Sequence, residues 1–349
     1  MTTDSEGRPT LPTVERGETQ LRFGCPRHPF PSDDTVAGIT DEPSLQNPAQ
    51  VGTRMGELTD AAWVLSALAS VLASGVDVPL PSDDPAGRVL VSYGFFADGA
   101  DGLVPTPAFA QALGDRARPF ADGIRSTLGQ AATAAFRGAS GAGWSAFGEE
   151  ILLAQGRASA MGGRMTAAFL PVLEGLAERF GAAGGGMFLD VGVGVAELAC
   201  AFCQAVPGSR VVGVDPLPQA IELATRTVAA NGLGDRIELR RQGVEQLDDE
   251  AVFDLAWVPL PFIPPPAVAE GLRRVQRALR PGGWLVLPSS TMEPGASGDI
   301  ARWQVHLSGG TLLGEPERAR LVEEAGFGSE VRLGTPPGAP PMLAVRRPL

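Results

Sequence analysis

The chain has 349 residues, 44% hydrophobic and 19% charged, which is long enough for two domains with a sizeable buried core. Its net charge of −12 argues against a nucleic-acid partner or an anionic membrane surface. All 28 basic residues are arginines, which excludes a Schiff-base lysine and a Walker-type phosphate loop. Because there are only two histidines, a His-rich metal centre is not expected either.

The first segment, residues 1–50, is rich in Pro, Thr, Asp and Glu and shows no sustained apolar periodicity, which predicts a mostly disordered tail. Cys25 and His28 lie in it; they could be half of a metal site, but two incidental residues are the favoured interpretation. The segment does not resemble a signal peptide, and the longest apolar run, residues 61–73, is too short to cross a bilayer. We therefore expect a cytoplasmic protein without a membrane partner.

Residues 51–140 carry the pattern of a mainly helical, winged-helix-like domain. Apolar residues recur at helical spacing from Gly52 to Ser74, and Asp84-Pro85 is typical of a helix start. An Asp-Gly turn within residues 97–102 separates two short apolar stretches, and Thr106-Pro107 is typical of the start of another helix. The domain has too few basic residues for a DNA-recognition helix.

Residues 141–186 are predicted to be linking helices, and strands alternate with amphipathic helices over residues 187–349. This alternation predicts a doubly wound α/β sheet with buried parallel strands. The strands are expected at 187–191, 210–215, 237–242, 254–258, 284–288, 331–333 and 342–345, and the helices at 196–205, 218–230, 268–279 and 316–325. Since no long helix separates the last two strands, they should form an antiparallel hairpin at one edge.

A glycine-rich turn follows the first of these strands, in the order Asp190, Val191, Gly192, Val193, Gly194. Glycines let the backbone turn sharply and approach a ligand, and the helix that follows presents free amides. A dinucleotide-binding turn would have Gly or Ala where this chain has Glu197. The turn therefore departs from the dinucleotide fingerprint.

Three further motifs follow in order. Asp215 ends the second strand, where a carboxylate can accept hydrogen bonds from both hydroxyls of a ribose, and Pro216 comes directly after it. A Pro-Gly-Gly turn at residues 281–283 enters the fifth strand, and Ala325-Gly326-Phe327 precedes the final hairpin.

Together and in this order, these motifs resemble the class I S-adenosylmethionine-dependent methyltransferases, over residues 187–347 and the helices just upstream. The preceding domain resembles the N-terminal domain of small-molecule, natural-product-type O-methyltransferases. The resemblance implies a Rossmann-like seven-stranded sheet whose last strand is antiparallel. It also implies S-adenosylmethionine as cofactor, a small-molecule substrate and a homodimer.

The resemblance also implies a set of cofactor-binding residues. Asp190, Gly192 and Gly194 would lie by the methionine moiety and sulfonium, Asp215 would hold the ribose, and Pro216 would flank the adenine. Gln242, Gly243, Val244 and Trp257 complete the wall around the cofactor. Val244 stands where the family often has an aspartate for the adenine amino group, so Gln242 or backbone groups could substitute. Upstream, Arg157 could pair with the cofactor carboxylate or form a surface ion pair.

The remaining motifs bear on the reaction. Amino-methylating enzymes carry a polar residue where this chain has Pro259, so N-methylation is not expected and residues 259–264 are interpreted as a rigid apolar loop lining the pocket. Many plant-type O-methyltransferases have a histidine directly after the fourth or fifth strand, and this chain has none there. His306 is therefore the candidate base or substrate contact, although it could equally be a solvated or capping residue.

We therefore expect methyl transfer to a small, largely apolar molecule in secondary metabolism, with O-methylation ahead of C-methylation. The first alternative is a methyltransferase-fold enzyme that catalyses cyclisation, decarboxylation or rearrangement. A ligand-gated DNA-binding regulator is the second, and the net charge argues against it.

Overall fold

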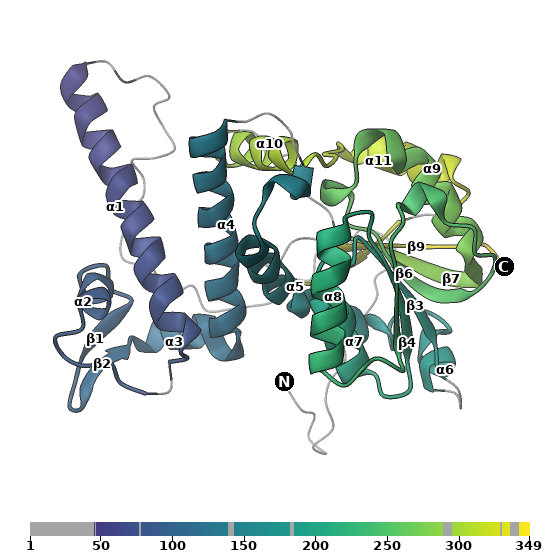
Figure 1. The fold of residues 1–349 in the computed structure, drawn as a ribbon, viewed down its shortest axis with the longest axis horizontal. Coiled ribbons are helices and arrows are strands. Elements are labelled where there is room, and N and C mark those ends of the chain that lie inside the picture. The colour runs from purple at the N-terminus through teal and green to yellow at the C-terminus, as the bar shows by residue number, and fades with distance from the viewer. Residues whose placement is uncertain are drawn as a thin grey trace.

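The computed structural model describes residues 45, 47–76, 78–138, 143–181, 185–288, 295–328, 330–335 and 342–349. Cys25, His28 and most of the predicted tail lie outside these residues. The chain forms a helical region beside a sheet domain (Figure 1). The first helix begins at Pro48, slightly before the predicted domain boundary, because the Asn47 side chain caps it by accepting a hydrogen bond from the Gln50 amide at 3.0 Å.

The helical region has the elements that the sequence predicts, in the predicted order. They are α1 (Pro48–Ala73), α2 (Pro85–Ser92), β1 (Phe96–Gly99), β2 (Gly102–Pro105) and α3 (Pro107–Leu113). The two strands pair antiparallel across the Asp-Gly turn, and the Asp84 side chain caps α2 by accepting from the Gly87 amide at 2.6 Å. Leu72, Leu90 and Leu103 form a fully buried core between these elements. The winged-helix interpretation agrees with this order and stays a prediction.

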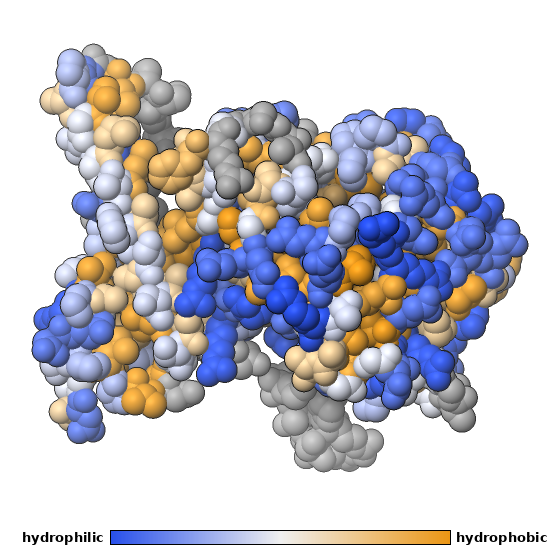
Figure 2. All heavy atoms as spheres, viewed as in Figure 1, coloured by the Kyte–Doolittle hydropathy of each residue, from blue (hydrophilic) through white to orange (hydrophobic). Residues whose placement is uncertain are grey.

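Helix α1 is longer than the apolar run that marks it in the sequence, and over 26 residues it is long and apolar enough to cross a membrane by those two criteria. Its C-terminal half is buried in the core of the helical region through Val64, Leu68 and Leu72, and it packs along α4. This packing is typical of a core helix. The N-terminal half stands away from the rest of the helical region and exposes apolar side chains, seen at the upper left of Figure 2.

Helix α4 (Ala117–Arg137) belongs to the helical region, with Ala121 and Ile124 in its core. Two further helices, α5 (Glu149–Phe169) and α6 (Leu176–Gly181), connect this region to the sheet. Helix α5 lies between α4 and the sheet domain and packs closely on α7 (Glu197–Ala205). A Cβ on Gly163 of α5 would lie 2.2 Å from the Leu198 carbonyl oxygen, and a Cβ on Gly156 would lie 2.0 Å from Val195 Cγ2. The contact between the two regions therefore requires glycine at these positions.

The sheet has seven strands in the order β5-β4-β3-β6-β7-β9-β8. Their bounds are β3 (Met187–Val191), β4 (Arg210–Val214), β5 (Ile237–Arg240), β6 (Phe253–Trp257), β7 (Leu279–Pro288), β8 (Val331–Leu333) and β9 (Met342–Arg346). Strands β3 to β7 are parallel, and β9 runs antiparallel to both β7 and β8. The predicted Rossmann-like sheet and its closing hairpin are confirmed. Strand β7 starts earlier than predicted, because Leu279 pairs with Phe253 ahead of a shift in register.

Helices cover both faces of the sheet. Helices α6, α7 and α8 (Pro218–Ala230) pack on one face, and α9 (Pro265–Ala278) and α11 (Glu315–Glu324) pack on the other. Successive residues of β3, Phe188 and Leu189, belong to the two opposite cores, as the alternation of a strand requires. Helix α10 (Ala296–Ser308) was not predicted, because Ile300 and Trp303 are exposed and Leu307 alone of its large apolar residues is buried, so the sequence shows no apolar face.

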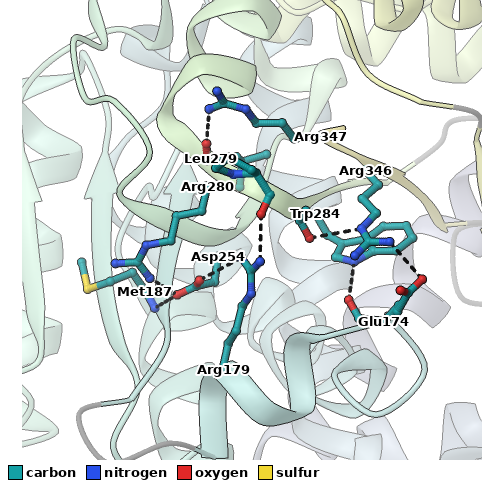
Figure 3. Close-up of polar contacts among 11 residues, drawn as sticks. Glu174, Arg179, Met187, Asp254, Leu279, Arg280, Trp284, Arg346 and Arg347 are labelled. Carbon is teal, nitrogen blue, oxygen red and sulfur yellow. Dashed lines mark hydrogen bonds and ion pairs between the residues drawn. The ribbon is translucent and has the colours of Figure 1, made fainter. Parts of the chain in front are cut away.

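Hydrogen bonds and ion pairs connect the strands at their amino-terminal ends (Figure 3). The buried carboxylate of Asp254 accepts hydrogen bonds from the Met187 amide at 2.9 Å, from Arg179 at 3.2 Å and from Arg280 at 2.7 Å. These donors come from β3, α6 and the start of β7. This cluster fixes the amino-terminal ends of the strands, whereas the site described below lies at their carboxyl ends.

The close contact of α5 with α7 gives a first prediction. Gly163→Ala should destabilise the protein by about 1–3 kcal/mol or more, because the new Cβ meets a backbone carbonyl that cannot rotate away. Gly123→Ala is the matched control in the interior of α4, where the Cβ meets nothing closer than Ala158 at 4.0 Å. The control should gain up to about 1 kcal/mol of helix propensity. Urea unfolding of both variants measures the difference, and equal stability of Gly163→Ala and wild type would contradict it.

Candidate active site

A large cavity opens at the carboxyl ends of β3, β4 and β6, with a volume of about 1740 Å³. Cavities for one drug-sized ligand commonly measure about 300–1,000 Å³, so this one has room for two ligands. One end is formed by the glycine-rich turn and the strand ends, and the other by helices α3 and α4 of the helical region. The loop after β6 lines it as predicted, with Phe262 packed edge-on against Trp144 at 5.3 Å between ring centroids.

The glycine-rich turn adopts a conformation that explains its composition. Gly192 and Gly194 have φ of +68° and +55°, in the left-handed region that favours glycine. The amides of Gly192 and Val193 both donate to the Val214 carbonyl, at 2.9 and 3.0 Å, which holds the turn against β4. The turn leads into the N-terminus of α7, where backbone amides are free to meet a ligand.

Asp215 follows β4 at the cavity wall, and the backbone holds its carboxylate in place. One oxygen accepts from the Gly194 amide at 3.1 Å and the other from the Leu217 amide at 2.9 Å. Burial raises the pKa of Asp215, while these two backbone donors lower it. Each oxygen keeps a second lone pair. The carboxylate can therefore accept hydrogen bonds from a ligand in a fixed orientation.

Asp190 is the penultimate residue of β3 and is only 1% exposed. Its Oδ2 atom has no hydrogen-bond partner among the described residues. Burial, and then the nearby charge of Asp215, raise the pKa of Asp190 to about 8. A buried carboxyl group without a partner is costly, so a cationic or hydrogen-bond-donating ligand would stabilise this wall of the cavity.

The segment after β5 forms the next part of the wall. Gln242, Gly243 and Val244 all line the cavity, and Val244 packs against Gly271 of α9. The Nε2 atom of Gln242 is buried without a partner among the described residues. Pro216 and Trp257 line the same cavity. Glu245, which the sequence reasoning did not single out, lies beside them.

This geometry can now be compared with known proteins. Residues 188–283 match a family model described as a methyltransferase domain. The fold is that of a class I methyltransferase. No match was found among curated protein sequences.

Solved structures of the same fold extend over the helical region as well. An O-methyltransferase family protein from Burkholderia thailandensis shares 16% identity over 87% of this chain and 99% of its own, with a TM-score of 0.61. Human N-acetylserotonin methyltransferase, solved in complex with SAM, shares 13% identity over 88% of this chain and 100% of its own, with a TM-score of 0.61. The mitomycin 7-O-methyltransferase MmcR shares 21% identity over 85% of this chain and 97% of its own, with a TM-score of 0.55.

The residues of the cavity fit the cofactor of this class. S-adenosylmethionine, the methyl donor, presents an ammonium group, two ribose hydroxyls and an adenine ring with donors and acceptors. The wall offers Asp190 Oδ2 and Gln242 Nε2, neither of which has a partner among the described residues, and the remaining lone pairs of Asp215. All three lie on the same cavity as the glycine-rich turn. Hence all of the predicted cofactor residues except Arg157 are brought together.

Two predicted site residues lie elsewhere in the structure. Arg157 donates to Asp122 of α4 at 3.0 Å and does not line the cavity, so the ion-pair alternative holds. His306 is exposed on α10, whose cavity-lining residues are Ala301, Gln304, Val305, Ser308 and the following Gly309. At about 100° per residue, His306 points away from that face. This position does not support a role as catalytic base, and that role stays an untested prediction.

The structure adds two polar wall residues on α5, Gln155 and Ser159. They were missed because α5 is rich in Ala and Gly, so the sequence does not show which face is buried. The spacing between Gly156 and Gly163 would have indicated a close-packed face, but it does not distinguish a neighbouring helix from a ligand.

The raised pKa of Asp190 gives a second prediction. The folded protein holds this proton up to about pH 8, whereas the unfolded chain loses it near 3.8, so this group's contribution to stability is lost as the pH rises from about 4 to 8. Asp190→Asn should therefore raise the stability of the ligand-free protein near pH 8, by on the order of a few kcal/mol, and change it far less at pH 5.

Unfolding of both proteins at the two pH values measures this effect, and identical pH dependence would contradict it.

The same substitution should weaken binding of S-adenosylhomocysteine, which keeps the amine. Wild-type affinity should rise with pH up to about 8, because binding of a cation favours the ionised carboxylate. The variant should lack this rise, as calorimetric titration would show.

Proposed function

We propose that the protein transfers the methyl group of S-adenosylmethionine to a hydroxyl oxygen of a small, largely apolar molecule of secondary metabolism. The observation that carries the proposal is the two-ended cavity. Its cofactor end carries Asp190 and Asp215, and its other end is lined by apolar residues of the helical region: Phe109, Leu113, Pro119, Phe120 and Ile124. The net charge of −12 supports a small-molecule substrate rather than a nucleic acid.

The residues of the chain would contribute binding, orientation and exclusion of water. The cofactor supplies an electrophilic methyl group. Asp190 and Asp215 would fix the cofactor at two points, and the apolar wall would hold the acceptor in line with the methyl group. Alignment of this kind supplies much of the acceleration of a displacement reaction, and a dry wall keeps water from competing as nucleophile.

The acceptor proton limits which hydroxyl can react. The titratable side chains in the described lining are Arg116, Asp190, Asp215 and Glu245, and neither lysine nor histidine is among the described lining residues. An acidic phenol or enol fits such a wall better than an aliphatic alcohol, and C-methylation of an activated carbon is the second possibility. The same observation favours one alternative, a non-methylating reaction, which would proceed without release of S-adenosylhomocysteine.

A point variant tests the cofactor assignment. Asp215→Ala should weaken binding of S-adenosylmethionine and S-adenosylhomocysteine at least tenfold, because it removes a pre-oriented, charged hydrogen-bond acceptor. His306→Ala is the control, since this side chain is exposed and outside the cavity, and it should bind and turn over as wild type does. Calorimetric titration measures both. Unchanged binding by Asp215→Ala would count against the assignment, and loss of turnover in His306→Ala would restore the histidine.

We also propose that a second copy of the chain covers α1. Val51, Met55 and Leu58 recur along one face of its free half and are each more than 40% exposed. The apolar residues on this face continue to Leu65, which lines the cavity. An exposed apolar stripe of this kind is typical of an interface.

The dimer proposal predicts a change in mass in solution. The double substitution Met55→Glu and Leu58→Glu should shift the protein from dimer to monomer in sedimentation velocity, because it places two charges in an apolar interface. Thr53→Glu, exposed on the opposite face of α1, should leave the mass unchanged. A monomeric wild type would overturn the proposal.

A further inference from the structure

A short chain of polar side chains crosses from α4 to α5 at the cavity wall. Gln130 Nε2 donates to Ser126 Oγ at 2.8 Å, and Ser126 Oγ donates to Gln155 Oε1 at 2.9 Å. Ser126 is only 1% exposed, whereas both glutamines line the cavity. A buried hydroxyl therefore joins the two glutamines of the wall.

The hydroxyl fixes how Gln155 is presented. Ser126 has one proton, and it gives that proton to Gln155 while it accepts from Gln130. The Oε1 of Gln155 is thereby turned toward α4. Its Nε2 has no partner among the described residues, and Gln155 is a half-buried residue of the cavity wall, so this donor is available to a ligand. A ligand oxygen would satisfy it.

Gln155 lies next to the cofactor end of the cavity. Its neighbour Gly156 packs against Val195 at the end of the glycine-rich turn, and Gly162, two turns later, faces the indole of Trp257. Ser159, the other new polar residue on this helix, donates its own proton to the Gly156 carbonyl at 2.7 Å. Along the described part of α5, Gln155 is thus the side chain that presents a fixed donor where the two ends of the cavity meet.

We propose that Gln155 is a substrate-binding residue whose amide donates to a carbonyl or phenolate oxygen beside the atom that is methylated, and that Ser126 positions it. The inference rests on the proposed function. It narrows the acceptor to a hydroxyarene or enol with a conjugated carbonyl group next to the hydroxyl. A hydroxyl conjugated with a carbonyl group is acidic enough to lose its proton to water before the substrate binds. A hydrogen bond from Gln155 to the carbonyl then stabilises the bound oxyanion, so the transfer needs no side-chain base.

The test compares two acceptors of similar shape, 2-hydroxy-1,4-naphthoquinone and 2-naphthol, within a panel of hydroxyarenes with and without a neighbouring carbonyl. Gln155→Leu keeps the size and removes the donor. It should lower kcat/KM for carbonyl-bearing acceptors about ten- to hundredfold and leave those without a carbonyl within about twofold of wild type. Ser126→Ala should give the same selectivity with a smaller loss, since Gln155 remains but is no longer held.

Binding supplies a second measurement, independent of turnover. The Kd of 2-hydroxy-1,4-naphthoquinone for the enzyme loaded with S-adenosylhomocysteine should rise about tenfold in Gln155→Leu. Gln204→Leu, the same substitution on an exposed residue of α7 outside the cavity, should change neither measurement. S-adenosylhomocysteine should bind all variants equally, which shows that they are folded.

The outcomes separate this inference from the proposed function. Absence of S-adenosylhomocysteine release from wild type with every acceptor would overturn the proposed function, and this inference with it. Turnover in which Gln155→Leu affects both acceptor classes equally, or neither, would overturn the inference alone. So would a wild-type preference for acceptors that lack the carbonyl.

Discussion

The site depends on how closely α5 approaches α7. Gly163 lies on a backbone carbonyl of α7, and Gly156 on Val195 of the glycine-rich turn, so one helix touches the cofactor end at two points. Helix α4 packs on the other side of α5 and carries the apolar wall. A longer distance between α5 and α7 would move Gln155, and the whole acceptor end of the cavity, away from the reacting atoms. The missing side chains of two glycines thus set the dimensions of the site.

The cofactor end stores an electrostatic cost in the ligand-free protein. Asp190 and Asp215 are both buried, burial raises the pKa of each, and Asp190 has one oxygen without a partner among the described residues. At the amino-terminal ends of the strands, Asp254 is equally buried but accepts hydrogen bonds from two arginines and a backbone amide. Asp254 therefore stabilises the fold, whereas Asp190 and Asp215 retain oxygen atoms that can accept hydrogen bonds from a ligand.

Much of the sheet domain could be predicted from the sequence, because its strands are short apolar runs and its turns carry glycine or proline for steric reasons. The segments 187–191 and 218–230 match β3 and α8. Asp190 and Asp215 could be placed because the carboxyl ends of adjacent parallel strands must meet at one edge. The presence of helix α10 and the buried face of helix α5 could not be predicted from the sequence. Ile300 is exposed on α10, and α5 has small residues on every side, so neither helix shows which face is buried.

For the same reason, the sequence left two interpretations open for Arg157 and for His306, since a charged or imidazole side chain on a helix gives no indication of its direction. The direction comes from the partner, and Asp122 lies 35 positions away in the chain.

The two ends of the cavity belong to different parts of the chain, and this division bears on how the enzyme can change over evolution. The cofactor end is formed by strand ends and a glycine turn, where almost any substitution would disturb the backbone. The acceptor end is formed by side chains such as Phe109, Pro119 and Ile124, on helices that do not belong to the sheet. Mutations there can reshape the acceptor end while the methyl donor stays in place. A lineage of such enzymes can therefore acquire different products through substitutions in α3 and α4 alone.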